Sequence, residues 1–226
     1  MDSVLNSRQS RQSRQSLGTP SEPILIGLSG PSCSGKNTAS AILQDYGFYC
    51  IDADAVSRKV FTEHEKEILN LFQAEAEKRG INLKNKEGID KKAFALLVFS
   101  DEELLKKHED FILPIIEEKI WEEIKLAFTE KPDSPILLNA PTLHKTSLIK
   151  KCLFILYIDA PFILRLIRAK KRDRLPLKNI WLRFSKQKKF FSQYFFLNAD
   201  TIVVKNFWSS ASLKRKLLQE VQKRGF

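Results

Sequence analysis

Hydrophobic positions fall into two patterns along this chain. Five short apolar runs, each bounded by polar or turn residues, predict buried strands at residues 24–28, 48–51, 136–138, 153–158 and 201–204. Between them, apolar residues recur every three or four positions, which predicts helices after Lys36, over 104–124 and over 213–221. Pro114 lies inside the second helical pattern and is expected to kink or divide that helix.

Short strands that alternate with helices are typical of a parallel sheet with both faces covered. The interval 55–135 is too long for one crossover and is expected to hold a helical insertion. We therefore predict an α/β fold with a parallel five-stranded sheet and helices on both faces. Residues 1–22 are polar and repeat the triplet RQS three times, which predicts a disordered basic tail before one folded domain at 23–226.

Composition narrows the class of protein. No run of about 18 apolar residues is present, so no membrane span is expected, and the N-terminal stretch lacks the apolar centre of a signal peptide. The three cysteines are interpreted as free thiols in a cytoplasmic protein. The three histidines are widely spaced and predict no zinc site, and His108 is expected on a helix face.

The net charge of +11 is concentrated in one basic cluster at residues 165–189. Such a cluster fits either a polyphosphate ligand or the solvated face of a helix. No base-reading motif accompanies it, so a nucleic-acid partner is not expected.

Residues 25–43, LIGLSGPSCSGKNTASAIL, predict a strand, a glycine-bearing loop and a helix. Gly30, Gly35 and Lys36 have the spacing G-x-x-x-x-G-K-[ST] of a phosphate-binding loop. The helix N terminus offers N–H groups to phosphates, the glycines permit close approach, and the lysine adds a charge. The predicted ATP site comprises Gly30, Cys33, Ser34, Gly35, Lys36, Asn37 and Thr38.

The loop departs from its motif at one position, where Asn37 replaces the usual Ser or Thr. The amide oxygen of asparagine is an acceptable hard ligand for Mg²⁺, directly or through a water. We expect a weakened metal site that still works. Thr38 carries a hydroxyl, but on a helix it points about 100° away from position 37.

Further motifs, together with the loop, resemble those of the dephospho-coenzyme A kinase family. They are IDAD at 51–54, EGIDKKAFALLVFSDEELLKKHEDFILPII at 87–116, LLNAPTL at 137–143, LIRAKKRD at 166–173 and ADTIVVKN at 199–206. The resemblance implies a nucleotide-binding core, a helical CoA-binding insertion near 60–130 and a lid near 162–195. It also implies a cytoplasmic kinase that uses ATP and Mg²⁺ to phosphorylate the ribose 3′-hydroxyl of dephospho-CoA, the last step of coenzyme A biosynthesis.

The same resemblance assigns roles to individual residues. Asp54 corresponds to the base that accepts or orients the hydroxyl proton, and it touches the acceptor substrate. Lys36 and Arg172 act on the transferred phosphoryl group, and Arg168 shares the ATP site with Arg172. Lys91 occupies a basic position on the CoA side, and Asp52 is expected to support the turn that carries Asp54.

Three departures from the family pattern leave alternatives open: Asn37, Leu113 in place of His before Pro114, and Lys145 in place of Glu. They motivate the alternative of a nucleotide-binding regulatory protein with weakened catalysis. The loop also resembles those of guanylate-kinase-type enzymes, so a kinase for another nucleoside or nucleotide is a further alternative.

Overall fold

The computed structural model describes residues 22–86, 88–141, 143–173, 180, 181, 184, 200–207 and 209–226. They form two compact units. The first unit contains the described residues up to Asp52 and from Glu123 to the C terminus, and the second comprises Ala53–Glu122. The expected tail at 1–22 lies outside the described residues apart from Glu22.

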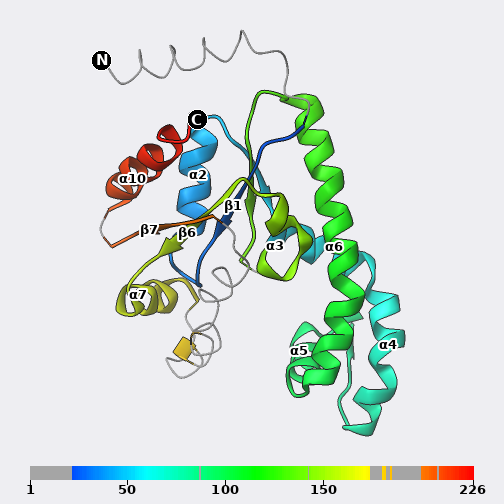
Figure 1. Cartoon of the computed structure of the whole chain (residues 1–226). Helices are drawn as coiled ribbons and strands as arrows, with labels where there is room; N and C mark the ends of the chain where they lie inside the picture. Colours follow the sequence, from blue (N-terminus) through cyan, green and yellow to red (C-terminus); the bar gives the residue numbers. More distant parts are fainter. Residues whose placement is uncertain are drawn as a thin grey trace. The chain divides into compact units, whose positions relative to one another are not determined.

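The first unit is built on a parallel five-stranded sheet in the order β2-β5-β1-β6-β7. Every pair in this sheet is parallel, including the pairing of Leu25 on β1 with Ile136 on β5. This confirms the predicted fold class (Figure 1). The strands are β1 (Leu25–Ser29), β2 (Tyr49–Asp52), β5 (Ile136–Asn139), β6 (Phe154–Asp159) and β7 (Thr201–Lys205).

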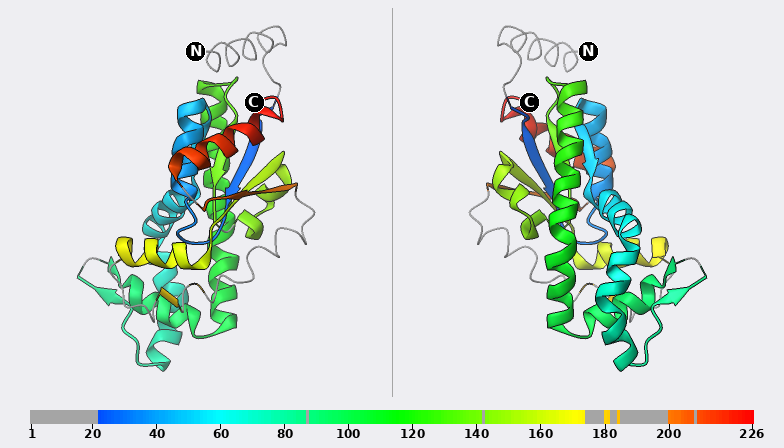
Figure 2. Two further views of the ribbon diagram at one scale, coloured as in Figure 1. Left: turned by 90° about the vertical axis from the view of Figure 1, so that its left-hand side faces the viewer. Right: turned by 90° about the vertical axis from the view of Figure 1, so that its right-hand side faces the viewer.

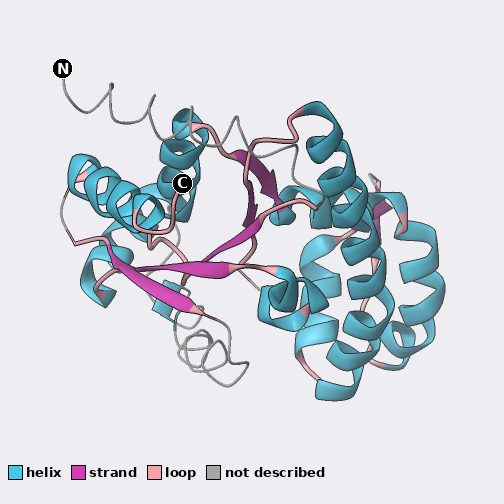
Figure 3. Cartoon of the chain, turned by 45° about the horizontal axis from the view of Figure 1, so that its top comes forward, coloured by secondary structure: helices cyan, strands magenta, loops and turns pink. Residues whose placement is uncertain are grey.

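The two faces of the sheet are covered by different parts of the chain, because successive side chains of a strand point to opposite faces. On β1, Ile26 and Leu28 belong to the core cluster formed with α2 (Lys36–Tyr46) and α10 (Ser210–Gln222). A side chain at Gly27 would instead meet Leu143 and Cys152 on the other face. Figure 3 shows helical segments on both sides of the strands.

The remaining elements of the first unit follow β5 and β6. Two short 3₁₀ helices, Leu143–Lys145 and Ser147–Lys151, connect β5 to β6, and α7 (Phe162–Asp173) follows β6. In Figure 2, α7 is the yellow helix. The segment after Asp173 that was expected to complete the lid lies largely outside the described residues.

The second unit is mainly helical. It contains α3 (Ala53–Glu63), α4 (Glu65–Lys78), the antiparallel pair β3 (Lys84–Asn85) and β4 (Gly88–Ile89), α5 (Lys91–Phe99) and the first part of α6 (Glu102–Glu130). Its core includes Val60, Ile68, Phe72, Phe94 and Leu97, which are all buried.

The helix α6 runs through Pro114 without a break, so of the two expected effects, a kink or a division, the division does not occur. Pro114 has no N–H, so the carbonyl of Asp110 lacks its helical hydrogen-bond donor. Both residues are exposed. Ile112, Ile116 and Ile120 are buried along the opposite side. Burial of that apolar stripe outweighs the one missing hydrogen bond.

Candidate functional site

The predicted phosphate-binding loop connects β1 to α2 and has three residues with positive φ. These are Gly30 at 142°, Cys33 at 61° and Gly35 at 107°. A side chain at Gly30 would clash with the carbonyl of Ile158, and one at Gly35 would clash with the amide of Asn206. Both glycines are therefore required by close backbone approach as well as by their conformation.

Lys36, the first residue of α2, reaches back over this loop. Its Nζ donates hydrogen bonds to the carbonyls of Gly30 at 2.8 Å and Pro31 at 3.2 Å. The N-cap of α2 is Gly35, which has no side chain to bond the first-turn N–H groups, and the first turn holds no acidic residue. The loop thus presents the positive end of a helix together with an ammonium group, which is the chemistry of a phosphate site.

Ser34 is the most enclosed residue of the loop. It is fully buried, and its Oγ makes no hydrogen bond within the described part of the chain. Its carbonyl accepts hydrogen bonds from Asn206 Nδ2 at 2.7 Å and from Arg168 Nη1 at 3.3 Å. These contacts tie the loop to the middle of α7 and to the residue that follows β7.

Arg168 and Arg172 lie one turn apart on α7, as expected, but they make different contacts. Arg168 Nη1 also donates to the carbonyl of Cys33 at 3.3 Å, so it lies against the loop. Arg172 Nε donates to Asp173 Oδ1 at 2.6 Å, and Arg172 Nη2 donates to Asp173 Oδ2 at 3.2 Å. These hydrogen bonds raise the pKa of the Arg172 guanidinium. Its side chain is 59% exposed.

A third arginine of α7, Arg165, was not singled out from the sequence as a site residue. Its guanidinium carbon lies 4.6 Å from the centroid of the Phe184 ring, and burial lowers its pKa. The nearby side chains of Tyr157, Asp159 and Cys33 partly oppose this lowering of the Arg165 pKa. The sequence signal that could have indicated Arg165 is its position three residues before Arg168, which places the two arginines on neighbouring turns of one helix.

Polar residues gather where the parallel strands end, which is the edge where open α/β sheets bind ligands. Asn139 ends β5 opposite Asp52 of β2, and its buried Oδ1 lacks a hydrogen-bond partner within the described residues. Ser29, at the end of β1, donates to the carbonyl of Pro141 at 3.4 Å. Asp52 is exposed at this edge.

Asn37 and Thr38 are exposed on the first turn of α2. The described residues contain no group of three or more His, Cys, Asp or Glu side chains able to hold a metal ion. A metal at this loop would therefore depend on oxygen ligands from a bound nucleotide, with Asn37 as the side chain at the motif position. That donor set fits Mg²⁺, which keeps several waters and uses substrate phosphates.

Asp54 and Lys91 belong to the second unit and are described within it. Asp54 is exposed in the first turn of α3, two residues after β2 ends. Lys91 begins α5, and its Nζ lies 5.7 Å from the ring centroid of Phe61. Of the two other departures from the family pattern, Leu113 is half-buried on α6 and Lys145 is exposed in the first 3₁₀ helix.

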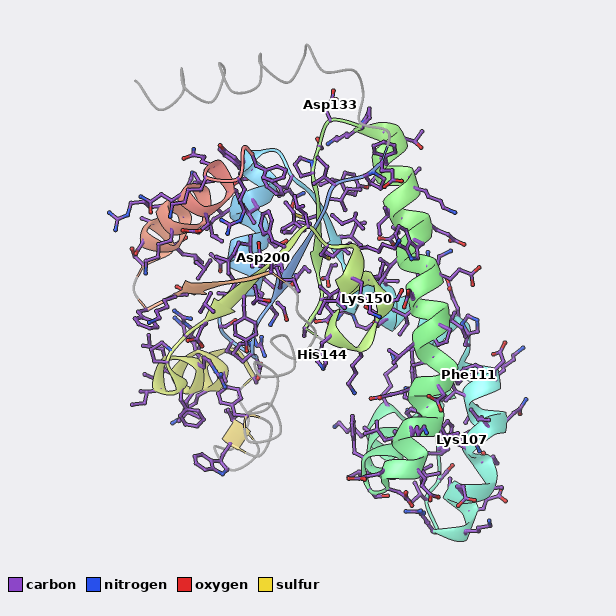
Figure 4. All side chains as sticks on the ribbon, in the orientation of Figure 1. Lys107, Phe111, Asp133, His144, Lys150 and Asp200 are labelled. Atoms are coloured by element: carbon purple, nitrogen blue, oxygen red, sulfur yellow. The ribbon has the colours of Figure 1, made fainter. Side chains whose placement is uncertain are left out.

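His108 lies on a face of α6, as expected, and that face packs within an aromatic cluster of the second unit. Its ring centroid is 5.0 Å from that of Phe94, 6.1 Å from Phe72 and 6.4 Å from Phe61. Lys107, the preceding residue on α6, is labelled in Figure 4. Its Nζ lies 5.4 Å from the centroid of the Phe72 ring. His108 is half-buried there, between the rings of Phe72 on α4 and Phe94 on α5.

The basic cluster beyond Asp173 lies outside the described residues, and so does most of the lid segment to residue 195. Within the described residues, no helix combines the length and the apolar character that crossing a membrane requires.

Comparisons with known proteins agree on one family. The dephospho-CoA kinase family model matches residues 24–206. The chain is 93% identical to the dephospho-CoA kinase of Treponema denticola over 226 residues, which is 100% of both chains. It is 44% identical to the dephospho-CoA kinase of Treponema pallidum over 202 residues, covering 89% of this chain and 95% of the relative.

Solved structures support the same architecture. The structure of TT1252 from Thermus thermophilus has a TM-score of 0.75 and 26% identity, covering 90% of this chain and 98% of that chain. The dephospho-CoA kinase from Campylobacter jejuni has a TM-score of 0.62 and 24% identity, with coverages of 89% and 96%. At 24% identity, the second likeness shows the fold alone.

Proposed function

The chain belongs to the dephospho-CoA kinase family, and from this premise we propose that it transfers the γ-phosphoryl group of ATP to dephospho-CoA. The acceptor is the ribose 3′-hydroxyl and the product is coenzyme A. Phosphoryl transfer requires positioning and charge neutralisation more than covalent help from the protein. The proposal therefore assigns each step to residues that position groups or carry charge.

The observation that carries the proposal is the geometry of the phosphate loop. Gly30 and Gly35 leave no room for side chains, and Lys36 Nζ lies against the loop carbonyls. A polyphosphate that entered this loop would meet the first-turn N–H groups of α2 and the Lys36 ammonium. The arrangement supports ATP as the donor.

The arginines of α7 provide further positive charge. Arg168 donates to the loop carbonyls of Cys33 and Ser34, so its guanidinium is already held beside the loop. Arg172 is more exposed, and its bidentate pairing with Asp173 shows that its fork suits an oxyanion. We assign Arg172 to the charge that spreads over the phosphoryl oxygens in the transition state.

Mg²⁺, when bound with the nucleotide, supplies charge neutralisation at the phosphate oxygens. Asn37 is the residue of this chain that would hold it, through its amide oxygen or a water. This departure from the usual hydroxyl predicts a higher Mg²⁺ requirement.

Asp54 is assigned the proton of the 3′-hydroxyl. It follows the end of β2 by two residues, where an exposed carboxylate can receive or orient that proton. Asp52, the last residue of β2, is assigned to support the turn that carries Asp54. Lys91 is assigned to the anionic part of the acceptor. A cytoplasmic location stays a prediction.

A direct assay tests the proposal. The protein is incubated with ATP, Mg²⁺ and dephospho-CoA, and ³¹P NMR follows the new 3′-phosphate. We expect coenzyme A to form, and Asp54→Asn to lower turnover by about a hundredfold or more, within the usual range for loss of a general base. Hydrolysis of ATP without an acceptor product, or transfer to another nucleoside only, would contradict the proposal.

A further inference from the structure

The C-terminal end of α7 holds one acidic residue in a strongly basic part of the chain. Asp173 is the last residue of α7, and the sequence has no other Asp or Glu between Asp159 and Asp200. The last turn of α7 is otherwise basic. A negative charge at this end of a helix opposes the helix dipole, whereas the basic residues beside it are favoured there. The presence of Asp173 is therefore explained by its contacts and not by the stability of the helix.

Asp173 holds the guanidinium of Arg172 along one edge. Its Oδ1 accepts from Arg172 Nε at 2.6 Å, and its Oδ2 accepts from Arg172 Nη2 at 3.2 Å. Two parallel hydrogen bonds fix the plane of a guanidinium as well as its position. The Asp173 side chain is only 14% exposed and that of Arg172 is 59% exposed, so the carboxylate is the anchored partner. Asp173 therefore sets the direction in which the Arg172 side chain points.

This pairing does not use up the donors of the guanidinium. A guanidinium has five N–H donors, and the contact with Asp173 takes one on Nε and one on Nη2. It leaves both donors of Nη1 and the second donor of Nη2, which lie along the edge that points away from the carboxylate. That edge can donate to two oxygens of a phosphoryl group while Asp173 holds the other edge. Pairing with Asp173 and binding of a phosphoryl group are therefore compatible.

The guanidinium that Asp173 holds lies near the phosphate loop. The hydrogen bonds to Asp173 contribute most to the raised pKa of Arg172, and the nearby Cys33 side chain of the loop also raises it. Arg168, one turn earlier on the same face of α7, donates to the carbonyls of Cys33 and Ser34. Arg168 thus attaches α7 to the loop, and the oriented guanidinium of Arg172 follows one turn farther along the same helix.

We propose that Asp173 is a positioning residue that orients the Arg172 guanidinium for the transferred phosphoryl group. The inference rests on the proposed function, in which Arg172 stabilises the charge on that group. In this role Asp173 contacts neither ATP nor the acceptor, and it acts through Arg172. An arginine that is already oriented loses less conformational freedom when the transition state forms, so the contribution of Asp173 falls on kcat.

The test measures initial rates with ATP and dephospho-CoA for Asp173→Ala, Asp173→Glu, Arg172→Ala and the double variant Arg172→Ala/Asp173→Ala. Asp133→Ala, which removes an exposed carboxylate from the loop between α6 and β5, is the matched control. Guanidinium chloride is added to each protein below the concentration that unfolds it, with an equal concentration of sodium chloride as the reference. Equilibrium binding is measured in the same proteins with ADP alone and with ADP and aluminium fluoride, which together mimic the transferred phosphoryl group.

We expect Asp173→Ala to lower kcat about tenfold, with KM for ATP and for dephospho-CoA within about twofold of the natural values. Asp173→Glu, which can still form both hydrogen bonds, should regain most of the lost kcat, and Asp133→Ala should match the natural protein. The double variant should be no slower than Arg172→Ala alone, because the two residues act as one unit. Added guanidinium should raise the rate of Arg172→Ala about fivefold but not that of the double variant, which lacks the carboxylate that holds it.

Natural kcat in Asp173→Ala overturns the inference, and so do losses that multiply in the double variant or a guanidinium rescue that does not require Asp173. A lower kcat together with a lower free energy of unfolding in urea, with neither restored by Asp173→Glu, would assign Asp173 to the stability of α7 and also overturn it.

Absence of coenzyme A formation by the natural protein contradicts the proposed function instead. The binding measurements then decide the inference. Binding of ADP with aluminium fluoride should weaken in Asp173→Ala and in Arg172→Ala by factors that do not multiply in the double variant, while binding of ADP alone stays unchanged. Natural binding of both probes in Asp173→Ala, or an equal loss of ADP binding, overturns the inference in that case.

Discussion

Asn206, the first residue after β7, donates a hydrogen bond of 2.7 Å from its side-chain amide to the carbonyl of Ser34 in the phosphate loop. The two residues are 172 positions apart in the chain. Because Asn206 is itself buried, its amide occupies the space beside Gly35 that a larger residue there would need. The last strand of the sheet thus fixes the shape of a loop built near the start of the chain.

Replacement of Asn206 tests this anchor. We expect Asn206→Ala to lower the free energy of unfolding by about 1 kcal/mol, the usual size for one hydrogen bond, because Arg168 still donates to the same carbonyl. Asn206→Asp should cost more, since a carboxylate cannot donate and would face an oxygen. Urea unfolding and KM for ATP measure both effects, with the exposed Asn70→Ala as control. If both variants keep natural stability and natural KM, the anchor has no role.

Cys33 offers a test of backbone conformation in the same loop. Its φ of 61° is unfavourable for any residue with a side chain, by roughly 1–2 kcal/mol. Glycine removes that penalty but adds about 0.5–1 kcal/mol of unfolded-state entropy, so Cys33→Gly should change stability little. Cys33→Val should be destabilising by about 1 kcal/mol or more, because a β-branched side chain tolerates this region least. Thermal unfolding compares the three proteins, and equal stability of the Gly and Val variants would contradict the assignment.

Much of the fold could be predicted because strand signals are local. All five strands of the sheet begin and end within one residue of the predicted runs, and their parallel pairing is confirmed. The family and the class of enzyme, predicted from short motifs, are also confirmed. The pair β3–β4 was not predicted, because strands of two residues carry no periodic signal.

The site was less predictable where it depends on distant contacts. Gly30, Gly35 and Lys36 form a continuous motif, so their geometry follows from local sequence. The motif resemblance included Asn206 but gave it no role, since its contact with Ser34 depends on the order of strands in the sheet. Likewise, the packing of Arg165 over the Phe184 ring brings together two segments whose contact no periodic pattern in the sequence predicts. The roles of Asp54, Lys91 and Asn37 stay predictions.

His108 predicts a pH dependence of stability. Burial lowers its pKa and outweighs the raising effect of Glu109, while the ammonium groups of Lys91 and Lys107 lie over neighbouring rings of the cluster. The unfolded chain, with a histidine pKa near ~6.5, therefore binds a proton before the folded one does as pH falls. Stability contributed by neutral His108 is complete above that pH and decreases below it, down to the folded pKa.

Urea unfolding at several pH values between 5 and 8 measures this effect. The natural protein should lose stability below about pH 6.5, and His108→Leu should lose less over the same range because its side chain stays neutral. An identical pH dependence in the two proteins would show that His108 does not titrate on unfolding.

Replacement of Arg172 tests whether this arginine acts in catalysis or belongs to a solvated surface. Arg172→Ala should lower turnover by about ten- to a thousandfold if the guanidinium stabilises transition-state charge. Its side chain is 59% exposed, so stability should change by less than about 0.5 kcal/mol. The neighbouring exposed Lys171→Ala is the control. Natural turnover in Arg172→Ala would assign this residue to a solvated helix face.

The central claim, a working phosphate loop in spite of Asn37, is tested most directly by Mg²⁺ titration. Coenzyme A formation from ATP and dephospho-CoA is measured in the natural protein, Asn37→Ser and Lys36→Ala. We predict that the natural protein is active and requires more Mg²⁺ than Asn37→Ser, because an amide oxygen replaces the usual hydroxyl ligand. Lys36→Ala should be nearly inactive at every Mg²⁺ concentration. A natural protein that is inert throughout the titration, with transfer restored by Asn37→Ser, would contradict the claim and identify a nucleotide-binding protein that has lost catalysis.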